Sequence, residues 1–462
     1  MSQEEADQKE RVREPEHEEE TIAGVAAHVQ ACGIISSLLP TELWLSIFCF
    51  LSWEDLSNLA LVCRHFHLLT QTDNPLWKHL YLTHFSTPPS LLLLYSSSSS
   101  SAQQTKHKWR GLVRLHRDIE KNWQSGRYRL HTLQDRHTDR VWSARLDLEA
   151  SKLYTASTSD LIQIWDLHPA LSQDTSKQTA SDASSGHHSS PSSSLLRGHT
   201  AEVRCLEVRG NTLVSGAYDS TVRVWDVAGR KLLRTLAQEH DVYALQFDEE
   251  KIVCACGDGA LRVFAMESGD GGGEASSSSL SSGAVAPLQT LLGHSACLRA
   301  VKYDKNMIIS GGEDALTNVW DMRTGKCERT VKMHDRGVSS LQFKDNLLMT
   351  GSFDTTVKMV DLRTFECIRT LTPNTKSSAG YFYYYLPLSV WSLQFDDKKL
   401  VTSHGTGNVK IWNYHTGEEL ATTTEHRGEV ITLNFSLHLM ATGGEDRSIK
   451  LYDFSPSSIE AH

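Results

Sequence analysis

Hydrophobic residues follow two different periods along the chain. Between residues 105 and 124 apolar side chains recur every three or four residues, up to Ile119 and Trp123, with Lys and Arg between them. This spacing predicts an amphipathic helix, and residues 36–84 show the same helical period. From Gly126 to Phe454 the pattern changes to short β-rich segments separated by turns. The sequence therefore predicts a small helical region followed by a long region of strands.

The strand region is built from a repeat. Its clearest copy reads GHTAEVRCLEV, TLVSGAYDSTVRVWD and LLRTL. One valine or leucine marks each copy: Val141, Val203, Val242, Leu298, Val338, Val390 and Val430. Three of the six intervals are 39 or 40 residues, and insertions at about 169–195, 267–287 and 377–388 explain the longer ones. A period near 40 with Gly-His at its start and Trp-Asp at its end is typical of four-stranded propeller blades. We therefore predict a mainly β fold with a seven-bladed propeller over residues 128–454.

The two ends of this region are expected to close the ring. The last copy ends with IKLYDF, which corresponds to its third strand. The segment RYRLHTLQ, just before the first copy, resembles the fourth strands KLLRTL and ECIRTL. We predict that residues 128–134 complete the final blade, because this leaves no sheet edge bare at the joint.

Four polar positions recur within the copies and resemble a catalytic set. They are His199, Ser215, Asp219 and Trp225, and again His294, Ser310, Asp314 and Trp320. A hydrolase needs one nucleophile and one base at a single oxyanion site, whereas a set repeated per copy is typical of buried polar groups that satisfy one another. Copies 3 and 6 depart from it, with Gln238, Leu386 and Thr406 in the equivalent places. We predict structural sets and no catalytic residues, so the chain is not expected to be an enzyme.

Composition narrows the classes of function. The chain has 462 residues and a net charge of −10, of which −6 lies in the first twenty residues. No basic block is present, which argues against a nucleic-acid partner. No apolar run reaches the ~18 residues of a membrane span, and the start lacks a signal-peptide pattern. Nine cysteines without a CxxC pair and 22 histidines without ligand spacing predict no metal and no cofactor. We expect reduced thiols and a location in the cytoplasm or nucleus.

The helical region carries more apolar residues than it can bury alone. It reads LLPTELWLSIFCFLSWEDLSNLALVCRHFHLLTQTDNPLWKHLY, and some 45 residues cannot enclose this much apolar surface. The remaining surface indicates a partner. The alternative is that the region packs internally, on the propeller or on the 105–124 helix.

This segment closely resembles an F-box, and the whole chain resembles the F-box/WD-repeat family, the substrate-recognition subunits of SCF-type ubiquitin ligases. The segment NWQSGRYRLHTL is also similar to the family's join between linker helix and propeller. The resemblance implies an all-α F-box at 36–84 that docks on a Skp-type adaptor, and through it on a cullin and a RING protein. It implies that the contact involves Leu39, Pro40, Ile47, Leu51, Leu59, Val62, Cys63 and Trp77. The alternative is a WD-repeat scaffold that recruits no ligase.

Two positions per copy are expected to face a substrate protein: the residue after the marker valine and the residue before the turn Asp. Aromatic and arginine side chains there are the types that carry binding energy. The candidates are Trp142, Arg204, Tyr218, Tyr243, Arg299, Phe353 and Trp391. They predict a contact led by aromatic side chains with at most one anionic group. Solvated rim residues without a partner are the alternative.

The remaining segments are expected to lie outside these domains. Residues 1–35 form an acidic head expected to be disordered, 85–104 a serine-rich loop, 105–127 a helical linker and 455–462 a tail. The insertion YFYYYLPL at 381–388 could be a partner-binding patch, a tolerated insertion or an error in assembly of the coding sequence.

Overall fold

The computed structural model describes residues 41–48, 51, 53–62, 64–71, 75–84, 108–133, 137–167, 193–266, 285–373 and 389–456. The chain divides into two compact units, Met1–Asp118 and Ile119–His462, and the boundary falls within helix α8 (Lys108–Ser125). The expectations for residues 1–35, 85–104 and 381–388 lie outside the described residues. Within the described part, no helix is both long and apolar enough to cross a bilayer.

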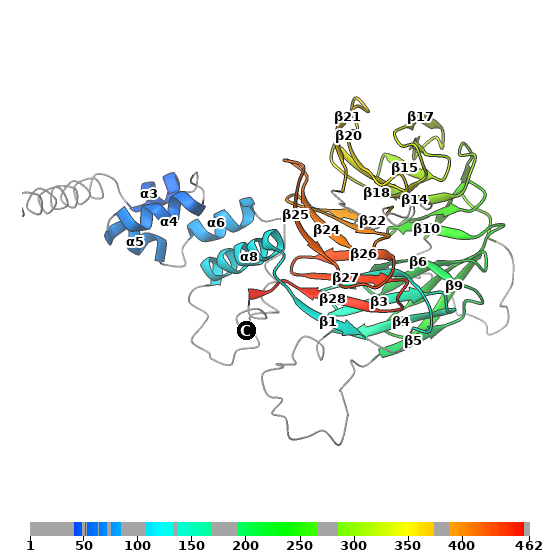
Figure 1. Cartoon of the computed structure of the whole chain (residues 1–462), viewed down its shortest axis with the longest axis horizontal. Coiled ribbons are helices and arrows are strands. Elements are labelled where there is room, and N and C mark those ends of the chain that lie inside the picture. Colours follow the sequence, from blue (N-terminus) through cyan, green and yellow to red (C-terminus); the bar gives the residue numbers. More distant parts are fainter. Residues whose placement is uncertain are drawn as a thin grey trace, which may run out of the picture. The chain divides into compact units, whose positions relative to one another are not determined.

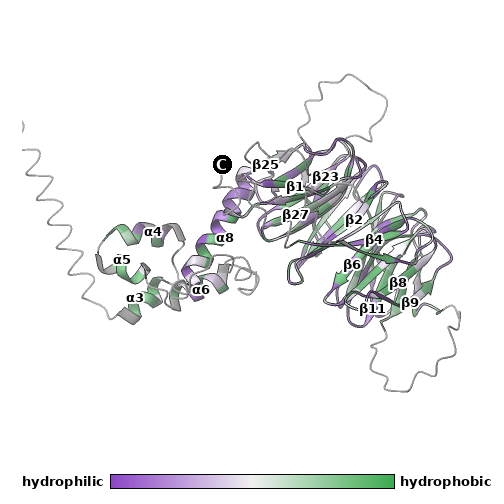
Figure 2. Ribbon diagram, turned by 90° about the horizontal axis from the view of Figure 1, so that it is seen from below, coloured by the Kyte–Doolittle hydropathy of each residue, from purple (hydrophilic) through white to green (hydrophobic). Residues whose placement is uncertain are grey.

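Short helices form the first unit. They are α3 (Thr41–Phe48), α4 (Trp53–Val62), α5 (Arg64–Gln71) and α6 (Pro75–His84), followed by the first part of α8. Helices of eight to ten residues are marginal alone, so tertiary packing has to hold them. Phe48 and Phe66 meet edge to face with ring centroids 5.4 Å apart. Tyr81 of α6 is fully buried and lies 5.8 Å from the ring of Trp109 in α8. Figure 2 shows the resulting mixture of apolar and polar positions on these helices.

The second unit is a ring of seven four-stranded antiparallel sheets (Figure 1). Blade 1 consists of β2 (Val141–Asp147), β3 (Lys152–Ser157), β4 (Leu161–Asp166) and β5 (Ser193–Arg197). Blade 2 consists of β6 (Val203–Arg209), β7 (Thr212–Ala217), β8 (Thr221–Asp226) and β9 (Lys231–Ala237). Blade 3 consists of β10 (Val242–Phe247), β11 (Lys251–Cys256), β12 (Leu261–Ala265) and β13 (Gln289–Leu291). Blade 4 consists of β14 (Leu298–Tyr303), β15 (Met307–Gly312), β16 (Leu316–Asp321) and β17 (Cys327–Lys332). Blade 5 consists of β18 (Val338–Lys344), β19 (Leu347–Ser352), β20 (Val357–Asp361) and β21 (Cys367–Leu371). Blade 6 consists of β22 (Val390–Phe395), β23 (Leu400–His404), β24 (Val409–Asn413) and β25 (Glu418–Thr423). Blade 7 consists of β26 (Val430–Ser436), β27 (Leu439–Gly444), β28 (Ile449–Asp453) and β1 (Arg129–Leu133).

The seven-bladed prediction is confirmed. Every marker valine or leucine is the first residue of an innermost strand and is completely buried. The first insertion is shorter than expected, because residues 193–195 begin β5, where Ser193 lies opposite Trp165.

The predicted ring closure is also confirmed. Strand β1 pairs with β28 in antiparallel register, from Arg129 opposite Asp453 to Leu133 opposite Ile449. The final blade therefore takes three strands from the end of the propeller sequence and one from its start (Figure 1).

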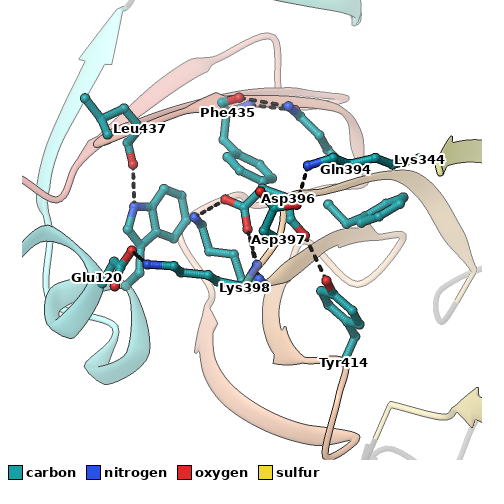
Figure 3. A network of polar contacts seen from close by, with 12 residues as sticks. Glu120, Lys344, Gln394, Asp396, Asp397, Lys398, Tyr414, Phe435 and Leu437 are labelled. Carbon is teal, nitrogen blue, oxygen red and sulfur yellow. Dashed lines mark hydrogen bonds and ion pairs between the residues drawn. The ribbon is translucent and has the colours of Figure 1, made fainter. Parts of the chain in front are cut away.

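The end of α8 is fixed to the propeller next to this closure. The Trp123 ring stacks on Phe454 at 3.7 Å between centroids, and its Nε1 donates to the Leu437 carbonyl at 2.8 Å. The Asn122 amide donates to the carbonyl of Phe454 at 2.9 Å. Glu120 forms an ion pair with Lys398, in the turn that follows β22 (Figure 3). The second half of α8 is therefore part of the propeller unit.

Side-chain amides tie several innermost strands to the next blade. They belong to the fifth residue of the strand, which is Gln246, Gln342 or Gln394 in blades 3, 5 and 6. Gln394 accepts from the Phe435 amide and donates to the Phe435 carbonyl, both at 2.8 Å (Figure 3). The other two glutamines do the same one blade on, since one amide carries both a donor and an acceptor. Asn434 of blade 7 accepts from the Leu146 amide at 2.8 Å.

We predict that Trp123→Ala lowers the free energy of unfolding of the propeller by about 3–5 kcal/mol, because it removes a large buried side chain beside the closure. Trp123→Phe keeps a ring on Phe454 and loses only the hydrogen bond to Leu437, which costs about 1 kcal/mol. Chemical denaturation of the full chain measures both. Lys398→Ala is the control, because an exposed ion pair contributes about 0–1 kcal/mol. Equal losses for Trp123→Ala and Lys398→Ala would contradict the assignment.

Candidate functional site

The repeated His, Ser, Asp and Trp residues meet inside their own blades. The His199 Nε2 lies 2.7 Å from Ser215 Oγ, its Nδ1 lies 2.8 Å from Asp219, and Trp225 Nε1 donates to Ser215 at 2.9 Å. His294, Ser310, Asp314 and Trp320 repeat these contacts in blade 4. Both serines are completely buried. Their hydroxyls satisfy buried polar groups and are closed to a substrate.

Hydrogen bonds within these sets stabilise the carboxylates. Burial alone would raise the pKa of Asp219, but the hydrogen bonds from His199 and Thr221 outweigh burial and hold the pKa well below its usual range. The pKa values of Asp354 and Asp446 are lowered for the same reason in blades 5 and 7. In each of these blades the Asp also accepts from the backbone amide of the residue after the histidine, so one carboxylate joins the connection before the innermost strand to the turn that holds the Asp.

The two blades that depart from the repeat still contain hydrogen-bonded polar side chains in place of the missing histidine. In blade 6, His404 of β23 lies 2.8 Å from Thr402 Oγ1, and Trp412 Nε1 donates to the same hydroxyl at 2.9 Å. In blade 3, the buried Arg262 binds Asp258 through two hydrogen bonds of 3.2 and 2.6 Å. A different cationic or imidazole side chain thus replaces the missing histidine in each blade.

The candidate substrate positions lie where the innermost strands begin. In all seven blades the residue after the marker valine falls in a β-bulge, without a partner on the next strand. A bulge turns the side chain away from the regular pleat. The amide of the residue that precedes the turn Asp or its equivalent donates to the carbonyl of the residue before the marker, again in every blade. The two sets of candidates are therefore neighbours, and they form one rim.

Arg204 is held among three aromatic rings of this rim. Its guanidinium carbon lies 3.4 Å from the ring centre of Trp142, 5.1 Å from Tyr218 and 5.4 Å from Tyr243. Burial lowers the pKa of Arg204. Among the described residues Arg204 forms no ion pair, although cation–π contacts orient it. Its hydrogen-bond donors are available to an anion.

The other candidates are arranged differently. Arg299 binds Glu313 through Nε at 2.8 Å and Nη2 at 2.5 Å, so its charge is already matched. Phe353 and Trp391 form an edge-to-face pair, 5.2 Å between centroids, across blades 5 and 6. Arg140 pairs with Glu445 at 2.5 Å across blades 7 and 1. The rim thus combines one unpaired arginine with aromatic surface and two internal ion pairs.

The helical unit exposes apolar side chains on several helices. Ile47 and Val62 are each 44% exposed, and Leu61 is 84% exposed. Sequence reasoning did not select Leu43, Leu61 and Leu68, which are also exposed. The i, i+4 spacing of Leu43 and Ile47 in α3 and the adjacency of Leu61 to Val62 could have indicated them.

Two known protein families match parts of this chain. Residues 36–83 match the F-box-like family. Residues 190–226, 285–321, 325–361 and 417–453 match the family described as WD domain, G-beta repeat. The chain is an F-box/WD-repeat protein.

Individual relatives resemble parts of this F-box/WD-repeat chain. Cell division control protein 4 of Saccharomyces cerevisiae is 34% identical over 28% of this chain and 17% of its own length. Mitochondrial division protein 1 of Neurospora crassa is 27% identical, over 42% of this chain and 24% of that protein, and that of Mycosarcoma maydis is 23% identical, over 66% and 38%. The chain therefore spans well under half of these relatives. The crystal structure of the computationally designed Ika8 protein matches with a TM-score of 0.50 and 25% identity, over 70% of this chain and 86% of that one.

The structure describes five of the eight residues expected at the adaptor contact. Ile47 and Val62 are exposed, and Leu51 and Leu59 are half-buried. Leu39, Pro40 and Cys63 lie outside the described residues. Trp77 differs from the expectation, because it is only 2% exposed and its Nε1 donates to the Thr70 carbonyl at 3.1 Å. Trp77 supports the F-box from inside, where its large ring fills the core.

The pH dependence of stability follows from two buried histidines of the propeller. Burial lowers the pKa of His137 and of His438 to about 4, whereas an unfolded histidine titrates near 6.5. As the pH falls below 6.5 the unfolded chain binds protons that the folded chain does not. We predict that the free energy of unfolding falls between pH 7 and pH 4, by up to about 2 kcal/mol per histidine at pH 5.

Denaturant unfolding at several pH values measures this dependence. His137→Gln removes one titrating group and should flatten the curve. Identical curves for wild type and His137→Gln would contradict the prediction. A second decrease is expected below about pH 4, where Asp219, Asp354 and Asp446 lose the stability that their lowered pKa values contribute above the ordinary pKa of about 3.9.

Proposed function

We propose that the protein is a non-catalytic substrate-recognition subunit of an SCF-type ubiquitin ligase, acting in the cytoplasm or nucleus. The F-box would bind a Skp-type adaptor, and through it a cullin and a RING protein, while the propeller rim would hold the substrate protein. Ubiquitin transfer would then depend on proximity to the recruited conjugating enzyme. The observation that carries the proposal is the exposed apolar surface on an F-box-like unit joined to a complete propeller.

The proposed adaptor contact consists of exposed apolar side chains on three helices. Leu43 and Ile47 of α3 and Leu61, Val62 and Leu68 of α4 and α5 are each 44% to 84% exposed. Such a set on one small unit is more than scattered surface leucines would give, and burial against a partner would stabilise a complex by about 25 cal/mol per Å² of apolar area. Trp77 is buried, so it adds no exposed apolar area to this set.

We predict that the double variant Ile47→Ala, Val62→Ala weakens adaptor binding by about 2 kcal/mol or more, roughly thirtyfold, because it removes apolar contact area. Co-purification of the full chain with a Skp-type adaptor, followed by titration, measures the effect. Leu233→Ala is the matched control, since Leu233 is a 61% exposed leucine on the propeller strand β9.

The same experiment tests the alternative function. A well-folded wild-type chain that forms no complex with the adaptor would favour an interaction scaffold whose F-box-like unit recruits no ligase. Similarity to proteins named for mitochondrial division supports that alternative as the second candidate.

The rim supports a substrate contact led by aromatic side chains with one anionic group. Arg204 is the rim arginine without an ion pair among the described residues, while Glu313 neutralises Arg299. A second anionic group on the substrate would lie near the carboxylate of Glu313 or Glu445, which would repel it. Trp142, Tyr218 and Tyr243 would cover the apolar neighbours of the anion, and Phe353 with Trp391 would add aromatic surface across the mouth.

We predict that Arg204→Ala weakens capture of peptides with a single phosphoserine flanked by apolar residues by roughly tenfold to hundredfold, because charge-assisted hydrogen bonds contribute about 1.5–3 kcal/mol. The measurement is fluorescence polarisation with a set of such peptides and their unphosphorylated and doubly phosphorylated versions. Arg299→Ala should have a smaller effect, and Arg329→Ala on the exposed strand β17 should have none. Equal capture by wild type and Arg204→Ala would remove the anionic part of the proposal.

A further inference from the structure

Four basic side chains form a row along one face of helix α8. They follow one another at intervals of four, three and four residues, and they are Arg110, Arg114, Arg117 and Lys121. At 3.6 residues per turn these positions fall within an arc of about 60° on the helix surface. Figure 2 shows that polar positions predominate along this helix. The basic row belongs to one continuous helix of 18 residues, so a single segment of chain presents all four charges.

The basic row lies opposite the buried face of α8. Leu112 and Ile119 are buried, and helical geometry places them about half a turn away from the row. Arg114 and Lys121 are exposed, and 42% of the Arg117 side chain is exposed. A partner can therefore reach these side chains without displacing the packed face of the helix.

The charges of the basic row are only partly matched. Asp118 Oδ1 lies 3.3 Å from Arg117 Nη2. Within the described part of the chain, Arg114 and Lys121 form no ion pair. Like charges four residues apart on a helix repel each other, and after burial the charge of Arg114 lowers the pKa of Arg110 further. A negatively charged partner would remove this repulsion.

The start of the chain carries the complementary charge. Residues 4–20, the acidic segment, hold nine acidic and three basic side chains, so −6 of the total charge of −10 lies there. Blocks of like charge of this kind are often interaction segments. Residues 21–40 join the acidic segment to α3, and 20 residues can span up to about 70 Å, whereas α8 is about 27 Å long. A segment tethered within reach has a high effective concentration at its site.

We propose that the acidic segment binds the basic row of α8 within the same chain. Carboxylates pair with guanidinium and ammonium groups through charge-assisted hydrogen bonds, and the exposed row offers several such donors side by side. Binding would hold the first residues of the chain beside the linker helix, and it would weaken as salt screens the charges. The inference does not depend on the proposed ligase function, because it concerns neither the adaptor contact nor the rim.

Carbodiimide cross-linking of the full chain tests the proposal, because this reagent joins a lysine amine to a carboxylate that is in contact with it. Lys121 is the reporter within the basic row. Wild type at low ionic strength is expected to give links between Lys121 and carboxylates of residues 4–20, identified by mass spectrometry of digests. In about 1 M salt, where the screening length falls to about 3 Å, their yield should fall roughly tenfold. The ion pair between Lys398 and Glu120 supplies the positive control in each low-salt sample.

A double variant separates the basic row from general charge effects. Arg114→Gln, Arg117→Gln keeps Lys121 and removes two neighbouring charges, and we expect its Lys121 links to the acidic segment to fall by about fivefold or more. Both changed side chains lie on the solvent face of α8, so the variant is expected to fold. Arg323→Gln, Lys326→Gln is the matched control and should behave as wild type, because it removes two exposed cations from the turn between β16 and β17.

Three outcomes would overturn the proposal. The first is a sample in which Lys398 links to Glu120 but Lys121 does not link to residues 4–20. The second is an equal yield of Lys121 links in wild type and in Arg114→Gln, Arg117→Gln. The third is a link that joins two copies in a mixture of isotope-labelled and unlabelled chain, because the acidic segment would then bind the helix of a second copy.

Discussion

The pairing of β1 with β28 is the contact on which the rest of the propeller depends. Each blade packs only on its two neighbours, so a ring of seven has one joint that no continuous stretch of chain supplies. About 320 residues separate the two strands, so their pairing has to outweigh the entropy cost of closing a loop of that length. The structure concentrates further contacts there: Trp123 stacks on Phe454, and Asn122 binds the Phe454 carbonyl. Helix and strand thus close the ring together.

Once the ring is closed, repeated and variable positions have separate physical roles. The marker residues and the His–Ser–Asp sets are buried and fix each blade, so a change there affects stability. The bulged residues have no partner on the neighbouring strand, so their side chains do not determine the sheet. Trp142, Arg204 and Ile431 can therefore occupy equivalent places without altering the blade. Specificity for a partner can change at the rim while the scaffold keeps its stability.

The sequence predicted what local repetition encodes and missed what tertiary packing decides. Blade number, innermost strands and closure follow from a 40-residue period, because each blade forms mostly from contacts close in sequence. Trp77 was expected at the adaptor contact from the family resemblance, which does not tell a residue of the core from one of a docking face, and it is buried. His404 replaces a histidine of the repeat from two residues beyond Thr402, a position with no repeat signal. The aromatic surroundings of Arg204 come from three blades, so no single copy reveals them.

Lys302 shows where the chain departs from its own structural rule. Where the amide tie is missing between blades 1 and 2, Ser143 accepts the Leu206 amide and Arg145 binds Glu207, so the contact is replaced. Between blades 4 and 5, among the described residues, the equivalent strand residues Ala300 and Lys302 supply no such bond. Lys302 therefore gives up the amide tie, and its side chain is only half-buried. Because glutamine makes the tie in three other blades and the ring is still complete, the tie supports the contact between neighbouring blades without being required at every one of them.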